Sequence, residues 1–474
     1  MLLVVAAGVF SVAGSPVANA SATIGSWTST IQVGVIGVHA ALLNTGKVLL
    51  YEFDANNGVG SKAVLFDPAT STSSRVDVPF RRNIICSGIS LLADGRVLTT
   101  GGEPYTAGGN DAFQGIREST IFDPATNRWT DPGVMAYPRW YPSNVLLPNG
   151  STLVFSGRDA AGTRNIAQVE RYDPATGRWT TLPAAANRQT GLYPRTVVLP
   201  DGRILVTRSL NGVTDTFDPR TNAWKQIDTM NAGQRQDGSV VLLPGLQRYL
   251  SVGGKTKTAV TKTAEILDMS AANPQWTYTG AMAFARRNPN LVLLADGTVL
   301  AVGGGTTVGP SGATKTAELY DPATGRWRQM AAQTAARTYH STALLLPDGR
   351  VLSAGATSGL PEQTTVDIYS PPYLFKGPRP TISSVPGSAG YGQQLAISTP
   401  DASRISRVAL IRPGAVTHSV NFDQRYVDLT FTRGSGTLTA AIPSSANTAP
   451  PGWYLVVIVD TQGIPSVGKF LRLR

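Results

Sequence analysis

The segment DPATNRW at residues 123–129 is one of a series of related segments that recur through most of the chain. Clear copies read DPATGRW at 173–179, DPRTNAW at 218–224 and DPATGRW at 321–327, and degenerate copies begin at Asp67, Asp268 and Asp367. Successive copies start 56, 50, 45, 50, 53 and 46 residues apart. Each copy lies between β-rich runs, so the repeat indicates a unit of several short strands.

A second signal keeps the same period. Turn dipeptides flanked by apolar runs occur at 94–95, 149–150, 201–202, 296–297 and 348–349, with weaker versions at 45–46 and near Gly245. Asp-Gly and Asn-Gly supply the positive φ angles that two-residue hairpins require. Gly-Gly ends several of the following strands, and a Trp recurs later in the repeat. Together these features predict a seven-bladed kelch-type β-propeller over residues 21–375.

The repeat stops at Lys376. Residues 376–386 read KGPRPTISSVP, a Pro-rich boundary, and beyond it lie alternating apolar runs such as WYLVVIVD at 453–460. This pattern and length predict an immunoglobulin-like β-sandwich over residues 376–474. The chain as a whole is therefore expected to be all-β.

Residues 1–20 are predicted to be a signal peptide. An apolar run covers 2–12, and Ala18-Asn19-Ala20 forms a small-x-small cleavage site. The first basic residue is Lys47, so the usual positive n-region is missing, and an N-terminal strand is the alternative. We expect export, with the protein secreted, periplasmic or on the cell surface.

Composition narrows the range of partners. The net charge of +11 favours attraction to anionic cell-envelope surfaces. No basic cluster has interleaved aromatic residues, so nucleic acid is not an expected partner. No long apolar run follows the N-terminus, and no G-x-G-x-x-G motif indicates a nicotinamide or flavin. We expect a monomer acting on a small molecule.

Positions at one offset from each hairpin should face the propeller axis from neighbouring blades. Eight residues before the turn Asp or Asn stand Cys86, Tyr141, Tyr193, Asn288 and His340, and Tyr339 precedes the last of these. A thiol, phenols and an imidazole are thus expected at one end of one channel. Imidazole and phenolate together suit Cu(II) better than zinc or magnesium. Any one of these residues alone is more simply explained as packing.

These residues and their surroundings resemble the galactose oxidase and glyoxal oxidase family of copper radical oxidases, over almost the whole chain. The matching segments are IICSGISLLADGRVLTTGG at 84–102, RWYPSNVLLPNG at 139–150, RTYHSTALLLPDGRVLSAG at 337–355 and VTHSVNFDQRY at 416–426. The resemblance implies one copper ion bound by Tyr141, Tyr339, His340 and His418, with His418 carried by a hairpin of the C-terminal domain. It also implies a self-derived radical cofactor, a thioether between Cys86 and Tyr141.

The resemblance further implies a mechanism. Tyr339 would act as general base, and the Tyr141 radical would take a hydrogen atom from the substrate carbon. Copper would take the second electron, and dioxygen would leave as hydrogen peroxide. The remaining histidine, His39, is interpreted as structural.

The chain departs from the galactose oxidase pattern where a Trp shields the radical. That stretch reads SGRDAAG at 156–162 and has no aromatic residue, so Trp140 or another loop residue takes this place. The RWYP sequence is closer to the glyoxal oxidase branch and favours small aldehydes over galactose. The alternative to an enzyme is a non-catalytic exported kelch propeller that binds glycans or cell-envelope components.

Overall fold

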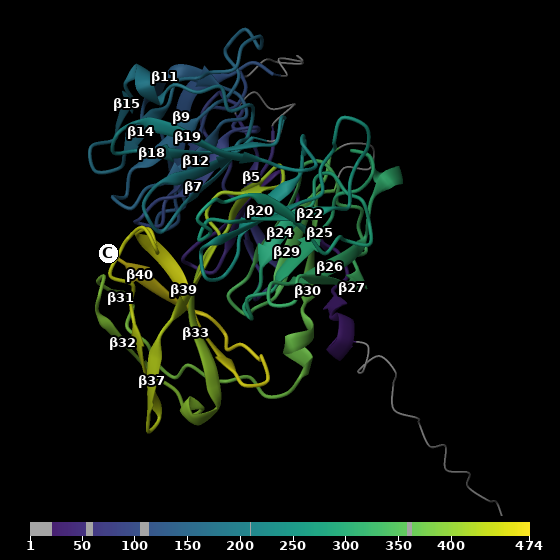
Figure 1. Ribbon diagram of the computed structural model, residues 1–474, viewed down its shortest axis with the longest axis vertical. Helices are drawn as coiled ribbons and strands as arrows, with labels where there is room; N and C mark the ends of the chain where they lie inside the picture. The colour runs from purple at the N-terminus through teal and green to yellow at the C-terminus, as the bar shows by residue number, and fades with distance from the viewer. Residues whose placement is uncertain (1–20, 54–59, 105–112, 209, 358–362) are drawn as a thin grey trace, which may run out of the picture.

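The computed structural model describes residues 21–474 except 54–59, 105–112, 209 and 358–362. The predicted signal peptide, 1–20, lies outside the described residues. The regular structure is almost entirely β, which confirms the all-β prediction (Figure 1). The described residues contain four short 3-10 turns, η1 (Ala184–Ala186), η2 (Pro310–Gly312), η3 (Pro372–Phe375) and η4 (Ala402–Arg404), and one further helical turn at 21–24. No described helix has the length and hydropathy to cross a membrane.

Antiparallel sheets of four to six strands follow one another along residues 39–370, in step with the sequence repeat. The first has β3 (His39–Leu42), β4 (Val48–Tyr51), β5 (Ala63–Asp67) and β6 (Thr72–Arg75). The second has β7 (Gly88–Leu91), β8 (Val97–Thr100), β9 (Ile116–Asp123) and β10 (Arg128–Thr130), and β11 (Val134–Arg139) also pairs with β9. The third has β12 (Ser143–Leu146), β13 (Thr152–Phe155), β14 (Glu170–Asp173) and β15 (Arg178–Thr181).

The remaining sheets of this series repeat the pattern. The fourth has β16 (Arg195–Val198), β17 (Ile204–Thr207), β18 (Val213–Asp218) and β19 (Ala223–Thr229). The fifth has β20 (Ser239–Leu242), β21 (Arg248–Val252), β22 (Ala264–Asp268) and β23 (Trp276–Thr279). The sixth has β24 (Asn290–Leu293), β25 (Val299–Val302), β26 (Thr316–Asp321) and β27 (Arg326–Ala332). The seventh has β28 (Ser341–Leu345), β29 (Val351–Gly355) and β30 (Thr365–Ser370), to which β1 (Ser26–Trp27) and β2 (Ile31–Gln32) pair.

The first strand of each sheet faces the interior, and the last faces solvent. β7, β12, β24 and β28 are buried along their whole length, whereas β6 is exposed throughout. First strands of successive sheets touch: β7 contacts β12, β12 contacts β16, β24 contacts β28, and β28 contacts β3. This is the order of contacts that a propeller requires, and closure into seven blades stays a prediction.

The C-terminal residues form two further sheets, drawn in green to yellow at one end of the molecule in Figure 1. One contains β31 (Ser388–Ala389), β33 (Ile405–Arg412), β36 (Arg425–Leu429), β39 (Gly452–Asp460) and β40 (Lys469–Leu473). The other contains β32 (Gln394–Ser398), β37 (Phe431–Gly434) and β38 (Thr437–Ala441). A shared apolar core lies between them, with Leu395, Leu438 and Ile458 buried in it. The immunoglobulin-like topology and the boundary at 375–376 stay predictions.

A hairpin links the two parts of the chain. β34 (Ala415–Thr417) and β35 (Val420–Asn421) lie between β33 and β36 in sequence, yet β34 pairs antiparallel with β3 of the first sheet. β34 also contacts β7 and β28. The C-terminal residues therefore reach the interior strands, with His418 at the tip of the hairpin.

Buried arginines brace the approach to the first strand in several sheets. Arg139, Arg235, Arg286 and Arg337 pair with Glu170, Glu265, Glu318 and Asp367, and at most 2% of any of these side chains is exposed. Each guanidinium also donates to a carbonyl after or at the end of the second strand of its own sheet, for example Gly303 at 2.8 Å and Gly355 at 3.1 Å. The loop before each first strand is thereby fixed to its sheet.

Candidate metal centre

The predicted axial positions share one unusual backbone conformation. The hairpin after the first strand is closed by the N–H of a leucine, such as Leu92 or Leu147. Six residues before this leucine, six of the seven sheets have a non-glycine residue with positive φ: Cys86 (59°), Tyr141 (61°), Tyr193 (43°), Asp237 (58°), Asn288 (55°) and His340 (65°), whereas the first sheet has Gly37 there. This conformation is rare for bulky side chains, so the repeated geometry imposes it.

Asp237 is the member of this series that counting from the turn missed. Its hairpin joins the Leu243 N–H to the Arg248 carbonyl and is one residue longer than the hairpin that joins Leu92 to Arg96. A count from the leucine instead of the turn residue would have found it. Asp237 forms an ion pair with Arg287.

Backbone hydrogen bonds connect neighbouring members of the series. The Tyr141 N–H donates to the Cys86 carbonyl at 2.9 Å, and the Tyr193 N–H donates to the Tyr141 carbonyl at 2.9 Å. The Asn288 N–H donates to the Asp237 carbonyl at 2.7 Å. The residues of each of these three pairs therefore lie side by side, and each residue comes from a different sheet.

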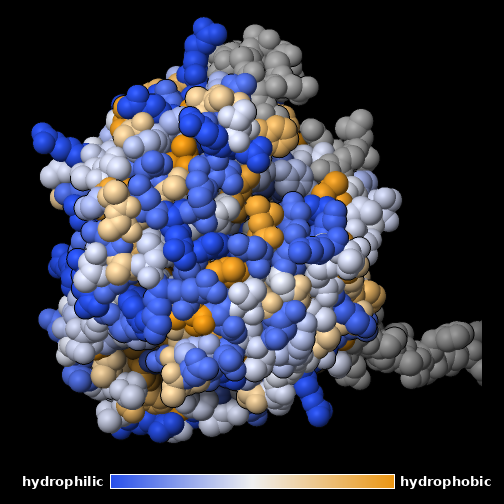
Figure 2. Space-filling view, turned by 45° about the horizontal axis from the view of Figure 1, so that its top comes forward, coloured by the Kyte–Doolittle hydropathy of each residue, from blue (hydrophilic) through white to orange (hydrophobic). Residues whose placement is uncertain are grey.

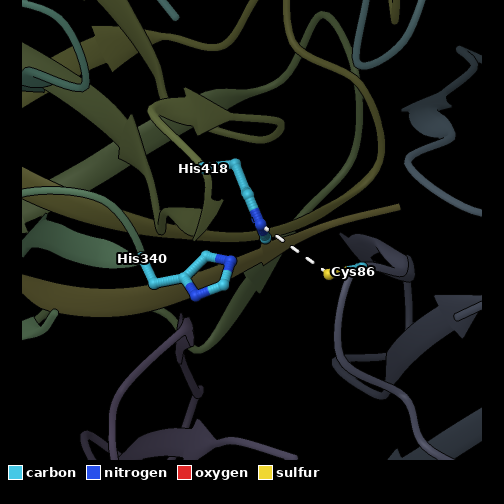
Figure 3. Close-up of side chains that lie close together, drawn as sticks. All are labelled: Cys86, His340 and His418. Carbon is cyan, nitrogen blue, oxygen red and sulfur yellow. Dashed lines mark hydrogen bonds between the residues drawn. The ribbon is translucent and has the colours of Figure 1, made fainter. Parts of the chain in front are cut away.

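The side chains converge on His418. Its ring centre lies 4.5 Å from those of Tyr141 and His340, and 4.9 Å from that of Tyr193. The Cys86 Sγ is 3.9 Å from His418 Nε2, and one ligand atom each of Cys86, His340 and His418 fall within 4.8 Å of one another (Figure 3).

The two phenols predicted as ligands meet at the same place. The Tyr141 and Tyr339 hydroxyls are hydrogen-bonded to each other. All the predicted ligands and Cys86 are thus brought together, whereas Asn288 lies on the wall of the adjoining pocket.

The hydrogen bonds of the imidazoles leave one nitrogen of each facing this centre. The Thr417 hydroxyl donates to the Val38 carbonyl at 2.8 Å, so His418 Nδ1, 2.6 Å away, must donate to Thr417. The lone pair of His418 is then on Nε2. His340 Nδ1 lies 2.6 Å from the Thr357 hydroxyl, and its buried Nε2 has no hydrogen-bond partner among the described residues.

Burial keeps the ligand groups uncharged. It lowers the pKa of His340 to about 3 and that of His418 well below its usual value, the latter with help from His340. Burial likewise raises the pKa of Tyr141 and of Tyr339 far above the usual phenol value. A bound divalent cation would reverse this preference for the phenols, because it stabilises phenolate, and would bind the imidazoles in the neutral form that burial already favours. Two imidazole nitrogens and two phenol oxygens are a donor set that fits Cu(II).

An aromatic ring covers Tyr141. The indole of Trp140 is parallel to the phenol within 7°, with ring centres 3.5 Å apart, and Phe113 meets the indole edge-on at 5.0 Å. Arg158, from the stretch at 156–162 that lacks an aromatic residue, lies with its guanidinium carbon 5.7 Å from the Trp140 ring centre. The sequence left open whether Trp140 or another loop residue covers Tyr141. In the structure, the ring stacked on Tyr141 is that of Trp140.

A pocket of about 310 Å³ leads to the centre. Tyr141, Tyr193, Tyr339 and His418 are among its lining residues. Phe113, Leu210 and Val308 line it too and are 51%, 46% and 36% exposed, so they form an apolar rim. The face of the molecule in Figure 2 is mainly hydrophilic with isolated hydrophobic residues.

His39 lies next to the proposed metal centre but is not one of the predicted ligands. It is fully buried, stacks on Tyr51 with ring centres 4.3 Å apart, and has its Nε2 3.3 Å from the Ser87 carbonyl. Its ring centre is 6.0 Å from that of His418. Its interpretation as structural stays a prediction.

Comparison with known proteins places this geometry in a family. The sequence matches the glyoxal oxidase N-terminus family over residues 51–373 and the galactose oxidase-like early set domain over 379–473. The chain belongs to the glyoxal oxidase and galactose oxidase-like family. The resemblance seen in the sequence is thereby confirmed.

Individual relatives of this family match most of the chain. A galactose oxidase of Gibberella zeae is 28% identical over 502 residues, which cover 95% of this chain and 71% of the relative. An aldehyde oxidase of Vitis pseudoreticulata is 26% identical, with coverage of 95% and 97%. A fungal alcohol oxidase, solved in complex with copper, superposes with a TM-score of 0.83 at 25% identity, covering 95% of this chain and all of that one.

Proposed function

We propose that the chain is a copper radical oxidase that oxidises a small aldehyde or primary alcohol with dioxygen and releases hydrogen peroxide. The observation that carries this proposal is the meeting of two phenols and two neutral imidazoles, from separate sheets and the C-terminal hairpin, beside Cys86. Family membership and the copper-bound fungal relative support it.

Tyr141, Tyr339, His340 and His418 are the proposed ligands. Copper bound by them would supply a Lewis-acid site for the substrate oxygen and an acceptor for the second electron. Hydrogen bonds at Nδ1 fix both imidazoles, through Thr357 for His340 and Thr417 for His418. Such outer contacts orient metal-binding histidines and set which nitrogen binds.

The phenols carry the proton and hydrogen-atom transfers. Tyr339, as phenolate, takes the proton of the substrate hydroxyl, and the Tyr141 radical takes a hydrogen atom from the adjacent carbon. A primary alcohol thereby becomes an aldehyde, and a hydrated aldehyde becomes an acid, with two electrons and two protons removed. Dioxygen accepts both and leaves as hydrogen peroxide. Both phenols line the pocket, where a substrate can reach them.

The radical site is proposed to be a Tyr141 linked to Cys86 by a thioether. The two residues are neighbours in the axial series and pack in one cluster with Trp140. The link makes one sulfur–carbon bond and removes one hydrogen from each residue, which dioxygen accepts as hydrogen peroxide. Trp140 covers the ring that would hold the unpaired electron.

The wider context of the enzyme is part of the proposal. Residues 1–20 are proposed to direct export, and residues 21–375 and 376–474 to form the propeller and the sandwich. The RWYP sequence at 139–142 favours small aldehydes over galactose.

Mass spectrometry tests the proposal directly. After exposure to copper and oxygen, the intact protein is expected to lose the mass of two hydrogens, and a proteolytic digest should contain the Cys86 and Tyr141 peptides joined. The Cys86→Ser protein is the control and should show neither change. A free thiol that still titrates fully in copper-treated protein would contradict the radical site.

A further inference from the structure

The Trp140 indole is held by a carboxylate from the neighbouring sheet. Its Nε1–H donates to Glu103 Oε1 at 2.7 Å, and only 5% of Trp140 is exposed. Glu103 directly follows Gly101-Gly102, beyond β8 of the sheet that begins after Cys86. A carboxylate from the sheet that follows Cys86 in sequence thus contacts the ring that covers Tyr141.

Glu103 is itself fixed in place. Its backbone N–H donates to the Asn83 carbonyl at 2.9 Å, and the Asn83 side-chain amide donates to Glu103 Oε2 at 3.4 Å. Half-buried, the carboxylate has little freedom to turn away from the indole. Hydrogen bonds to a charged acceptor are roughly twice as strong as neutral ones, so this contact defines the orientation of the ring.

The charge of Glu103 also reaches the proposed cofactor. Its carboxylate accepts the indole N–H at 2.7 Å, and the ring centre of that indole lies 3.5 Å from that of Tyr141. A negative charge beside this stack favours the loss of an electron from it, because electrostatic effects are poorly screened in a partly buried site.

We propose that Glu103 is a positioning residue for the oxidation of Tyr141: it fixes the Trp140 indole on the phenol and, through that indole, makes the phenol easier to oxidise. A carboxylate that accepts the N–H bond increases the electron density of the indole, and the stacked indole stabilises the electron-poor oxidised phenol. In this step the Tyr141 phenolate gives one electron to an added oxidant and becomes a radical, with no bond made to Trp140 or Glu103. The inference rests on the proposed function of Tyr141.

Redox titration of copper-loaded protein with ferricyanide measures the effect. Glu103→Gln keeps the size of the side chain and removes its charge. The equilibrium constant for oxidation of Tyr141, followed by the optical band of the radical, is expected to fall about tenfold, which is about 59 mV for a one-electron couple. Glu118→Gln, the same charge change on β9, is the matched control and should titrate like the parent protein.

A double-mutant cycle shows whether the effect passes through the indole. In a Trp140→Phe background, Glu103→Gln is expected to change the potential little, because the N–H donor is gone. Equal potentials of Glu103→Gln and parent would overturn the inference, and so would an undiminished shift in the Trp140→Phe background. If the glutamine variant does not fold, Glu103→Asp, which withdraws the carboxylate by one methylene, should shift the potential in the same direction, and a parental potential there would overturn the inference.

A copper-free measurement separates this inference from the proposed function. In protein labelled with ¹⁵N-tryptophan, the indole N–H signal of Trp140, assigned by its loss in Trp140→Phe, is expected to move in Glu103→Gln. An unmoved signal would overturn the role of Glu103 whatever the cofactor does. A moved signal in a protein that never forms the thioether would contradict the proposed function and leave the Glu103 contact established.

Discussion

At the scale of single residues, neighbours with similar surroundings have different proposed tasks. Tyr339 and His340 are adjacent in sequence, and their rings stack with centres 3.8 Å apart. Their hydrogen bonds differ: His340 is hydrogen-bonded to Thr357, and Tyr339 is hydrogen-bonded to Tyr141. His340 is thus positioned to hold a metal, while Tyr339 shares a hydrogen bond with the proposed radical residue and borders the pocket. A substitution of Tyr339 alone can therefore test proton transfer separately from metal binding.

Tyr339→Phe is expected to form the Cys86–Tyr141 link and bind copper, yet to lose turnover by about 10²–10⁴-fold, the usual contribution of a general base. The readouts are copper content, intact mass and peroxide production. Tyr391→Phe removes a phenol that donates to the Ala449 carbonyl and does not line the pocket, and should keep parental turnover. Near-parental turnover of copper-loaded Tyr339→Phe would remove the base from the mechanism.

Most of the centre could be predicted at this scale because equivalent residues of a repeat occupy equivalent places. Cys86, Tyr141, Tyr193 and His340 follow from a count along the sequence. His418 lies outside the repeat and needed the family resemblance. The contact between Trp140 and Glu103 could not be predicted, because it depends on how two neighbouring sheets pack and no spacing encodes it.

At the scale of elements, the buried arginine pairs explain how strained residues are kept in place. Arg139 stands two residues before Tyr141, and Arg286 two before Asn288, so each guanidinium fixes the chain just ahead of a residue with positive φ. Such backbone conformations persist only when the surroundings impose them. The sequence showed the repeat of strands and turns, but the pairing of each arginine with a carboxylate some 30 residues later became visible only in the structure.

Arg286→Leu is expected to destabilise the protein by about 3–5 kcal/mol, because Glu318 would remain buried without its partner. Urea unfolding followed by tryptophan fluorescence measures this. Arg75→Leu breaks an exposed pair with Asp77 and should change stability by about 0–1 kcal/mol. Similar small losses in both variants would show that the buried pair does not brace its sheet.

At the scale of the whole molecule, the centre belongs to two parts of the chain at once. The propeller-like sheets provide the phenols, Cys86 and His340, whereas His418 comes from the hairpin of β34 and β35. The all-β class was predictable from turn spacing alone. The pairing of β34 with β3 was not, since strands so far apart in sequence leave no periodic signal.

His418→Ala is expected to weaken copper binding at least about tenfold, since even outer contacts of metal ligands are worth about 10–100-fold. Competition titration against a chelator of known affinity gives the value. His39→Gln removes the one histidine near this point that is not a proposed ligand and should bind copper much as the parent does. Unchanged affinity in His418→Ala would show that the hairpin is not part of the metal site.

The β34–β3 pairing also sets the time at which chemistry becomes possible. A ribosome makes Cys86 and Tyr141 long before His418, and β1 likewise precedes its partner β30 in the chain. A chain made only as far as Tyr141 therefore has the thiol and the phenol but not the full set of proposed ligands. Under the proposed function, oxidative formation of the thioether would begin only after the hairpin that carries His418 has been made.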